Sequence, residues 1–297
     1  MMNILLGFFF AAVILIISYR VKFLTLSGSI ATFFLAGVIF SLGGIKWSVP
    51  ILTFFILSSI LSKLRKKKNE EVELFFEKSG VRDYMQVIAN GGAGGVLVIL
   101  YTLNPNELYY LIYLATLSAV CADTWATEIG TWKKTPTYNI LNLKPIEQGV
   151  SGGISWVGSV GAVLGSAAIA FSGIVWNSIS TLEYFVLIII SGVLGSFFDS
   201  LLGATIQAQN LCIVCSKITE KKIKNCFDLF ITSPIKKLYK SYLIQTYGDN
   251  ILRSTKKYRK THLFFPRCFN KITNLSETLT QALLLYSIHA ILQFSYL

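Results

Sequence analysis

The stretch LSAVCADTWATEIGTW, residues 117–132, carries two carboxylates, Asp123 and Glu128, directly after a nearly unbroken apolar run. A run of about 20 apolar residues is long enough to cross a bilayer as a helix. Backbone groups cannot stay unpaired in hydrocarbon, so such a segment must be helical. The stretch therefore indicates a membrane helix, and it raises the question of why acids stand inside it.

The composition of the whole chain also indicates a membrane protein. Of its 297 residues 53% are hydrophobic and 14% are charged, whereas soluble domains carry about 25% charged residues. We predict an all-α polytopic membrane protein with about eight transmembrane helices and a first helix that is retained, because no basic leader or small-residue cleavage site precedes Arg20. The eight predicted spans are 3–19, 27–43, 48–64, 84–103, 108–130, 152–173, 184–206 and 276–295.

The distribution of basic residues predicts the orientation. Among the 27 Lys and Arg residues, only Lys46 falls outside one set of alternate gaps between the spans. The positive-inside rule then puts that set in the cytoplasm and both termini outside. The net charge of +12 follows from this topology and attracts anionic membrane lipids, so nucleic acid is not an expected partner. We expect a multi-pass protein of the inner or plasma membrane of a prokaryote.

Ionisable residues inside the spans gather at one level, near the cytoplasmic face. An acid at the centre of a membrane helix costs about 2.5–3.5 kcal/mol on insertion scales, so its position needs a reason. These residues are Lys63, Arg82, Asp123, Glu128 and Asp199. Their common level predicts one shared site, and the alternative is that they only hold the helices together.

Helical spacing groups the polar residues into stripes. Arg82, Gln86 and Asn90 recur every four residues and would form one polar stripe that enters the membrane. Small residues at similar spacing let helix backbones approach closely, which predicts close packing of the later spans. The small residues are Gly158, Gly161 and Gly165 in one span, and Gly192, Gly195 and Gly203 in the next.

The two acids of the opening stretch point in different directions on a straight helix. Asp123 and Thr127 share one face, whereas Glu128 lies about 140° from Asp123 at 3.6 residues per turn. Asp123 and Glu128 can therefore face one small ion only if the helix ends or unwinds near Gly130.

The cytoplasmic loop after Gly130 is a candidate phosphate site. Pro136 and Pro145 exclude a long helix there. The sequence GVSGG (149–153) stands directly before the next span, and glycines with the free N–H groups of a helix start can bind an anion. Lys144 is close in sequence. The alternative is an ordinary junction between a loop and a helix.

Six motifs, in this order, resemble the transmembrane-protein-nineteen family, a former domain of unknown function. Its plant plastid member is the phytyl-phosphate kinase of tocopherol synthesis. The resemblance covers about residues 20–220 and implies a membrane kinase that converts an isoprenoid (phytyl or prenyl) monophosphate to the diphosphate with Mg²⁺ and a nucleoside triphosphate. CTP is the favoured donor, as in the loosely similar phytol and dolichol kinases. The motifs are LTLSGS (24–29), SSILSK (58–63), RDYMQVIANGG (82–92), ADTWATEIG (122–130), LKPIEQGVSGGIS (143–155) and GSFFDSLLGATIQAQ (195–209).

The resemblance assigns roles residue by residue. Ser151 stands where many members have Asn or Asp, and only Asn270 and Asn274 correspond to a polar stretch before the last span. The implied metal ligands are Asp123, Glu128 and Asp199, with Arg82 and Lys63 as further catalytic residues. The expected substrate- and nucleotide-binding residues are Gln86, Asn90, Thr127, Lys144, Gly149, Ser151, Gly152, Gly153 and Gln207.

The chain divides into a transmembrane domain, residues 1–210 and 271–297, and a basic cytoplasmic insert, residues 211–270. Cys212, Cys215 and Cys226, with Cys268 or His262 as a fourth ligand, have a spacing that permits a structural zinc site. Free thiols in a reducing cytoplasm are the alternative. The part 227–270 suits either an amphipathic segment on the membrane surface or a solvated basic loop.

Two other functions compete with the kinase. Acids in packed membrane helices also mark ion pathways, so an ion-coupled transporter is one alternative. A nucleotide-dependent lipid transferase is the other, because it uses the same metal and nucleotide chemistry. The position of the acids near one face, beside a Gly/Ser loop, favours the kinase over a carrier, whose charges we expect near the bilayer midplane.

Overall fold

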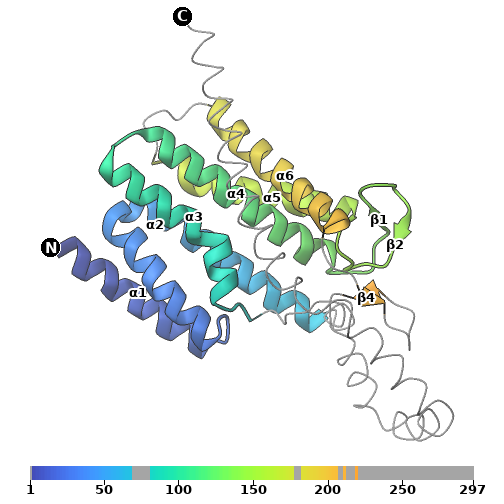
Figure 1. Cartoon of the computed structure of the whole chain (residues 1–297), viewed down its shortest axis with the longest axis horizontal. Coiled ribbons are helices and arrows are strands. Elements are labelled where there is room, and N and C mark those ends of the chain that lie inside the picture. Colours follow the sequence, from blue (N-terminus) through green and yellow to red (C-terminus); the bar gives the residue numbers. More distant parts are fainter. Residues whose placement is uncertain (1, 69–80, 177–181, 207–209, 212–217, 220–297) are drawn as a thin grey trace, which may run out of the picture.

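A computed structural model of the chain describes residues 2–68, 81–176, 182–206, 210–211 and 218–219, most of them in helices (Figure 1). Among these residues, α2, α3, α5 and α6 contain helices long and apolar enough to cross a membrane, and α1 is a shorter apolar helix. Membrane helices are therefore confirmed, whereas eight spans with outside termini stay a prediction. The helices are α1 (Met2–Arg20), α2 (Leu26–Lys68), α3 (Tyr84–Leu103), α4 (Glu107–Gly130), α5 (Trp156–Ile174) and α6 (Leu182–Thr205).

Helix α2 consists of two helical halves joined at Gly44. The backbone there has φ 60° and ψ −156°, a left-handed conformation that glycine adopts without strain. Leu35 of the first half and Ile51 of the second both approach Gly91 of α3, so the chain turns back on itself at Gly44. The two halves correspond to the predicted spans 27–43 and 48–64.

The turn of α2 is secured by tyrosines of α4. Pro50 has no N–H, so the carbonyl of Lys46, four residues earlier, lacks its helical donor. The Tyr110 hydroxyl lies 3.1 Å from that carbonyl oxygen, and the Tyr113 hydroxyl donates to the Trp47 carbonyl at 2.7 Å. The three aromatic rings are fully buried and form much of the hydrophobic core at this end of the bundle.

Helix α4 is the centre of the bundle and contacts α2, α3, α5 and α6. Its last turns lie against small residues of α5, because a Cβ added to Gly161 would be 2.6 Å from the Trp125 carbonyl oxygen. A Cβ added to Gly165 would be 2.8 Å from the Cys121 carbonyl oxygen. The predicted close packing of these glycines is therefore confirmed, and it leaves α4 deeply enclosed by its neighbours.

A small antiparallel sheet follows α4, and the all-α prediction missed it. Its strands are β1 (Thr137–Asn139), β2 (Pro145–Ile146) and β3 (Gly153–Ile154), in the order β2-β1-β3. A further strand pair joins β4 (Asn210–Leu211) to β5 (Ile218–Thr219). The prolines exclude a long helix from this loop, as predicted, but alternation over two or three residues is too short to indicate strands.

Candidate active site

Two aspartates from different helices lie together near the C-terminal end of α4. Asp123 of α4 and Asp199 of α6 have carboxyl groups close enough for a side-chain hydrogen bond. The two helices approach closely because Gly192 of α6 lies against the hydroxyl of Ser118 on α4, and that hydroxyl donates to the Ile188 carbonyl at 3.0 Å. Two carboxylates in contact repel each other unless a proton or a cation lies between them.

The aspartate pair fits one magnesium ion. Magnesium in phosphoryl-transfer sites is typically held by one or two carboxylates, with substrate phosphates and water as its other ligands. Nowhere in the described part of the chain do three Asp, Glu, His or Cys side chains gather in a group that could hold a metal. Asp123 and Asp199 could therefore supply two protein ligands to such an ion.

Glu128, the third predicted metal ligand, is engaged elsewhere. Its Oε2 accepts from Arg65 Nε at 2.7 Å, and its Oε1 accepts from Ser62 Oγ at 2.6 Å. Both partners lie on α2, and the Glu128 side chain is buried. Both carboxylate oxygens already accept hydrogen bonds, so Glu128 joins α4 to α2 in this structure, and its role as a metal ligand stays a prediction.

The straightness of α4 explains the separation of its two acids. The helix continues through Gly130 and is capped by Thr131, so it does not unwind where a shared site would need it to. Asp123 therefore faces α6 while Glu128 faces α2. The predicted cluster of acids is instead two groups at neighbouring turns, one on each side of α4.

The backbone of Arg82 is fixed by the loop between α1 and α2. Its N–H donates to the Phe23 carbonyl at 3.2 Å, and its carbonyl accepts from the Thr25 N–H at 3.0 Å. Thr25 also caps α2, because its Oγ1 accepts from the Gly28 N–H at 3.1 Å. Gly28 lies directly against the Arg82 carbonyl, where a Cβ would collide. The LTLSGS motif thus fixes the backbone position of Arg82 before α3.

The guanidinium of Arg82 is buried without a hydrogen-bonding partner among the described residues. Only 9% of the residue is exposed. Its Cζ lies 5.1 Å from the centre of the Phe54 ring, a cation–π contact, and Glu128 attracts it electrostatically. A buried guanidinium has five N–H donors, so Arg82 has unused donors and is a strong candidate for binding an anion.

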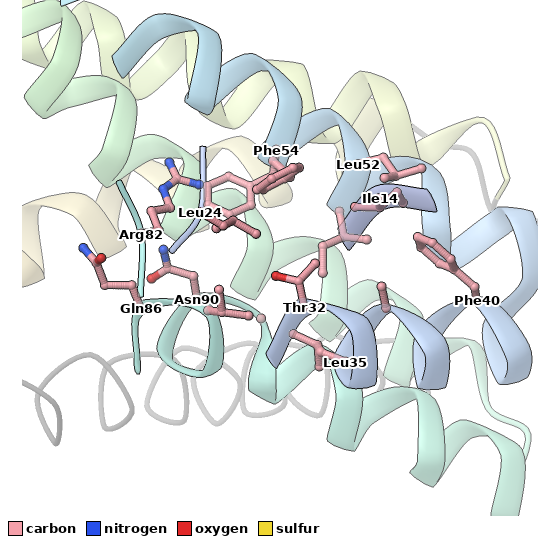
Figure 2. Close-up of a pocket in the computed structure, with 15 residues that line it drawn as sticks. Ile14, Leu24, Thr32, Leu35, Phe40, Leu52, Phe54, Arg82, Gln86 and Asn90 are labelled. Carbon is pink, nitrogen blue, oxygen red and sulfur yellow. The ribbon is translucent and has the colours of Figure 1, made fainter. Parts of the chain in front are cut away.

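Arg82 lies at the polar end of a cavity between α1, α2 and α3, shown in Figure 2. Gln86 and Asn90 lie at the same end, and the predicted stripe of Arg82, Gln86 and Asn90 is confirmed as one lining surface. The rest of the lining is almost wholly apolar, and the space measures about 540 Å³ including its opening. The cavity therefore suits a ligand with a polar head and an apolar body.

Three other predicted site residues are exposed side chains. Lys63 is exposed, with its Nζ 5.7 Å from the centre of the Phe23 ring, and Thr127 is exposed on α4. Lys144 is exposed between β1 and β2. The remaining predicted residues, Gln207, Cys212, Cys215, Cys226 and Cys268, lie outside the described residues.

The glycine motif 149–153 forms a turn and a strand and is not itself the start of a helix. Helix α5 begins at Trp156, and its N-cap Ser155 accepts from the Gly158 N–H at 3.1 Å. Gly149 and Gly152 have positive φ, of 91° and 81°. Gly152 also lies against the backbone of Ala204 on α6. Gly152 and Gly153 thus place the sheet against α6, whereas an anion-binding role for Gly149, Ser151, Gly152 and Gly153 stays a prediction.

Two contacts escaped sequence reasoning. Arg65 was counted only as one of the basic residues that set the topology, although Ser62 and Arg65 share a helical face at spacing i, i+3. Gln148 ties the sheet to the end of α4, because its Nε2 donates to the carbonyls of Gly130 and Lys133 at 2.6 and 2.7 Å. A glutamine in a loop gives no signal of such a role.

Comparisons with known proteins agree with the motif resemblance. The family described as integral membrane protein DUF92 matches residues 9–282, which confirms the predicted family. Protein PGR of Arabidopsis thaliana is 29% identical over 228 residues, which cover 69% of this chain and 79% of that protein. No solved structure matches the chain.

Two further relatives come from a cyanobacterium and from a plastid. An uncharacterized membrane protein of Synechocystis sp. is 27% identical over 199 residues, covering 63% of this chain and 73% of that protein. Protein VTE6, chloroplastic, of Arabidopsis thaliana is 25% identical over 189 residues, covering 62% of this chain and 56% of that protein.

Proposed function

The chain belongs to the DUF92 family of integral membrane proteins, and on that premise we propose that it is a membrane kinase. It transfers the terminal phosphoryl group of a nucleoside triphosphate to an isoprenoid monophosphate and forms the diphosphate. The motif resemblance to the family of the phytyl-phosphate kinase and the similarity to the plastid protein VTE6 support this reaction class.

One observation carries the proposal: two groups suited to phosphate chemistry flank the last turns of α4. On one side, the Arg82 guanidinium is buried at the polar end of an apolar cavity. On the other side, Asp123 and Asp199 form a carboxyl pair. A cationic donor group suits the acceptor phosphate, and a carboxyl pair suits the metal that accompanies a triphosphate.

The chemistry needs charge neutralisation more than a strong base. An oxygen of the acceptor monophosphate attacks the γ-phosphorus, a new P–O bond forms, and the bond between the γ-phosphorus and the β–γ bridging oxygen breaks, so that a nucleoside diphosphate leaves. Arg82 reduces the repulsion between the two anions and holds the acceptor. Asp123 and Asp199 would hold Mg²⁺, which neutralises charge on the transferred phosphoryl group when bound.

The finer parts of the proposal concern donor, topology and location. We propose CTP as donor and the cytoplasmic face as the site of reaction, with eight spans, both termini outside and the Gly44 turn facing outward. The plasma membrane of a prokaryote is the proposed location. The basic residues in the last turn of α2, from Arg65 to Lys68, support this orientation through the positive-inside rule.

Ion-coupled transport is the function that the carboxyl pair alone would also suit, since acids between packed helices mark ion pathways. The cavity at Arg82 favours the kinase, because an ion carrier has no need of an apolar cavity that ends at a buried guanidinium. A lipid transferase shares the metal chemistry but would join a nucleotide part to the lipid. Product mass therefore separates the three functions.

The test is an assay of the purified full-length protein with phytyl, geranylgeranyl or farnesyl monophosphate and CTP, ATP, UTP or GTP with Mg²⁺. Mass spectrometry should detect the isoprenoid diphosphate and the nucleoside diphosphate in equal amounts. Asp123→Asn and Asp199→Asn should abolish the product, whereas Glu107→Gln, an acid at the other end of α4, should not. A folded protein that makes no diphosphate from any pair would contradict the proposal.

A further inference from the structure

We propose that the cavity between α1, α2 and α3 binds the hydrocarbon chain of the acceptor lipid, with its phosphate at Arg82 and its far end at Phe40. The identity of the ligand as an isoprenoid rests on the proposed function. The class of ligand, a single-chain amphiphile with an anionic head, follows from the cavity itself.

The polar end of the cavity has three side chains with unused donors. The Arg82 guanidinium, the Gln86 side-chain nitrogen and the Asn90 side-chain amide make no hydrogen bond with any described residue, and all three residues line the cavity. The Gln86 side-chain oxygen is already used, because it accepts from the Asp83 N–H at 3.1 Å. This leaves the Gln86 nitrogen as a donor beside a cation. A cation surrounded by N–H donors that have no acceptor favours binding of an anion. Phosphate oxygens can accept hydrogen bonds from all of these donors.

The apolar end of the cavity is elongated, as a hydrocarbon chain requires. From Thr32 to Phe40 the first half of α2 rises about 12 Å along the cavity, at 1.5 Å per residue. The space of about 540 Å³ includes the opening of the cavity to its surroundings, so a chain can enter from the side without an enclosed passage. Figure 2 shows Arg82, Gln86 and Asn90 at one end and Phe40 at the other. The apolar lining includes Ile14, Leu24, Leu35, Ala36, Ile51, Leu52, Phe54 and Phe55.

Gly91 controls the width of the cavity. It lines the cavity, and a Cβ added there would lie 2.6 Å from Leu35 Cδ2, so a methyl group must displace the Leu35 side chain. Gly92, the next residue, is different, because its added Cβ would meet only Ile88 Cγ2 at 3.5 Å, an ordinary van der Waals distance. The two glycines give a matched pair of substitutions, of which only Gly91→Ala perturbs the cavity.

Phe40 sets the length of chain that fits. Its ring lies at the end of the cavity opposite Arg82 (Figure 2). Removing the ring extends the apolar space in the direction away from the phosphate. Phe40→Ala should therefore shift the preference towards a longer chain, measured as the ratio of affinities for geranylgeranyl and farnesyl monophosphate.

The experiment measures binding of farnesyl monophosphate to the full-length protein in nanodiscs, with no nucleotide present. Arg82→Gln should weaken binding about tenfold or more, since a hydrogen bond to a charged group contributes about 1.5–3 kcal/mol. Binding of farnesol should change little in this variant. Arg20→Gln, an exposed arginine at the end of α1, is the control and should stay within about twofold of wild type. Gly91→Ala should weaken binding of both ligands, and Gly92→Ala should not.

The proposal would be overturned if Arg82→Gln bound farnesyl monophosphate as tightly as Arg20→Gln, and Gly91→Ala as tightly as Gly92→Ala. Photolabelling of the wild-type protein decides the case if a variant does not fold. A farnesyl monophosphate with a diazirine on its chain should label residues of α1, the two halves of α2 and α3, and labelling confined to α5 and α6 would overturn the proposal.

The design separates this inference from the kinase. Specific binding that responds to Arg82 and Gly91, without any diphosphate formed, would support the cavity and contradict the kinase. Diphosphate formation by the wild-type protein, with unchanged affinity for farnesyl monophosphate in Arg82→Gln and Gly91→Ala, would support the kinase and contradict the cavity as the lipid site.

Discussion

Charged residues lie at both ends of α4, but their pairing differs between the two ends. At the Glu107 end, Lys46 pairs with Glu107 and its Nζ lies 4.4 Å from the centre of the Tyr110 ring. At the other end, Asp123 meets another acid, Asp199, and the Arg82 guanidinium has no hydrogen-bonding partner among the residues that the structure describes. Unlike charges pair at the first end. The second end has one such pair, Glu128 with Arg65, but it also has two acids in contact and a buried guanidinium beside a cavity.

This difference indicates which charged residues stabilise the fold and which are available to bind a ligand. A buried polar group without a partner has a large desolvation penalty, so a protein retains one only where something offsets it. The Glu107 end should respond to substitution through stability. At the Asp123 end, substitutions of Asp123, Asp199 and Arg82 should act through activity, whereas substitution of Glu128, which pairs with Arg65, should act through stability. The predictions below test that division.

The largest effect is expected for Asp199→Asn. Loss of a metal ligand in the transition state should lower the rate of diphosphate formation about a hundred- to a thousandfold. The melting temperature should stay the same or rise, because the change removes repulsion from Asp123 and an amide can donate to the remaining carboxylate. Activity assays and thermal unfolding of the same sample measure the two quantities.

The matched control is Glu107→Gln at the other end. It should leave specific activity within about twofold and lower the free energy of unfolding by less than about 1 kcal/mol, because the pair with Lys46 is partly exposed and screened. Loss of stability without loss of activity in Asp199→Asn would contradict the division between the two ends.

The next effect concerns Glu128, the one acid at the Asp123 end with a fully formed partner set. Removing one member of a buried ion pair leaves the other charge uncompensated and typically costs about 3–5 kcal/mol. Glu128→Gln should therefore destabilise the protein by about 3 kcal/mol. The double variant Glu128→Gln with Arg65→Met should recover much of that loss, as judged by denaturation in detergent. A stable Glu128→Gln protein that has lost only its response to Mg²⁺ would restore Glu128 as a metal ligand.

The helices were predictable because their apolar length is a property of the local sequence. The spans before residue 207 all correspond to helical segments, and the turn at Gly44 stands between two of the predicted spans. The sheet between Thr137 and Ile154 was not predictable, since each strand is only two or three residues long and is held by its pairing partners. Local periodicity does not record such pairing.

The directions in which the candidate site residues point were more predictable than their partners, and their roles stay a prediction. Helical spacing correctly separated Asp123 from Glu128 by direction, and it correctly aligned Arg82, Gln86 and Asn90. Which acid meets which partner depends on the packing of α2 and α6 around α4. The pair of Glu128 with Arg65 joins residues 63 positions apart, and one sequence alone gives no signal for a contact of that range.

A smaller effect is expected for Tyr110→Phe at the Glu107 end. The Tyr110 hydroxyl lies within hydrogen-bond distance of the Lys46 carbonyl oxygen, which has no helical donor because of Pro50. The same hydroxyl lies 2.9 Å from the Gly173 carbonyl oxygen. Its removal should destabilise the protein by about 1–2 kcal/mol and leave specific activity unchanged. Thermal unfolding measures the first, and Tyr109→Phe, a hydroxyl outside this contact, is the control. A large fall in activity would show that the Glu107 end contributes to the reaction.

The most local effect is expected for Gln148, which connects the sheet to the end of α4. Its amide donates to two carbonyls and lies 3.1 Å from the Thr135 hydroxyl oxygen. Gln148→Glu keeps the shape but replaces the donors with a carboxylate that faces acceptors, so it should cost about 1–2 kcal/mol locally, more than Gln148→Ala. Hydrogen exchange should increase in residues 131–155 and not in α2 or α3. Exchange that increases across the whole bundle would show that the sheet stabilises α4 itself. The Asp123 end would then include the sheet as well as the last turns of α4.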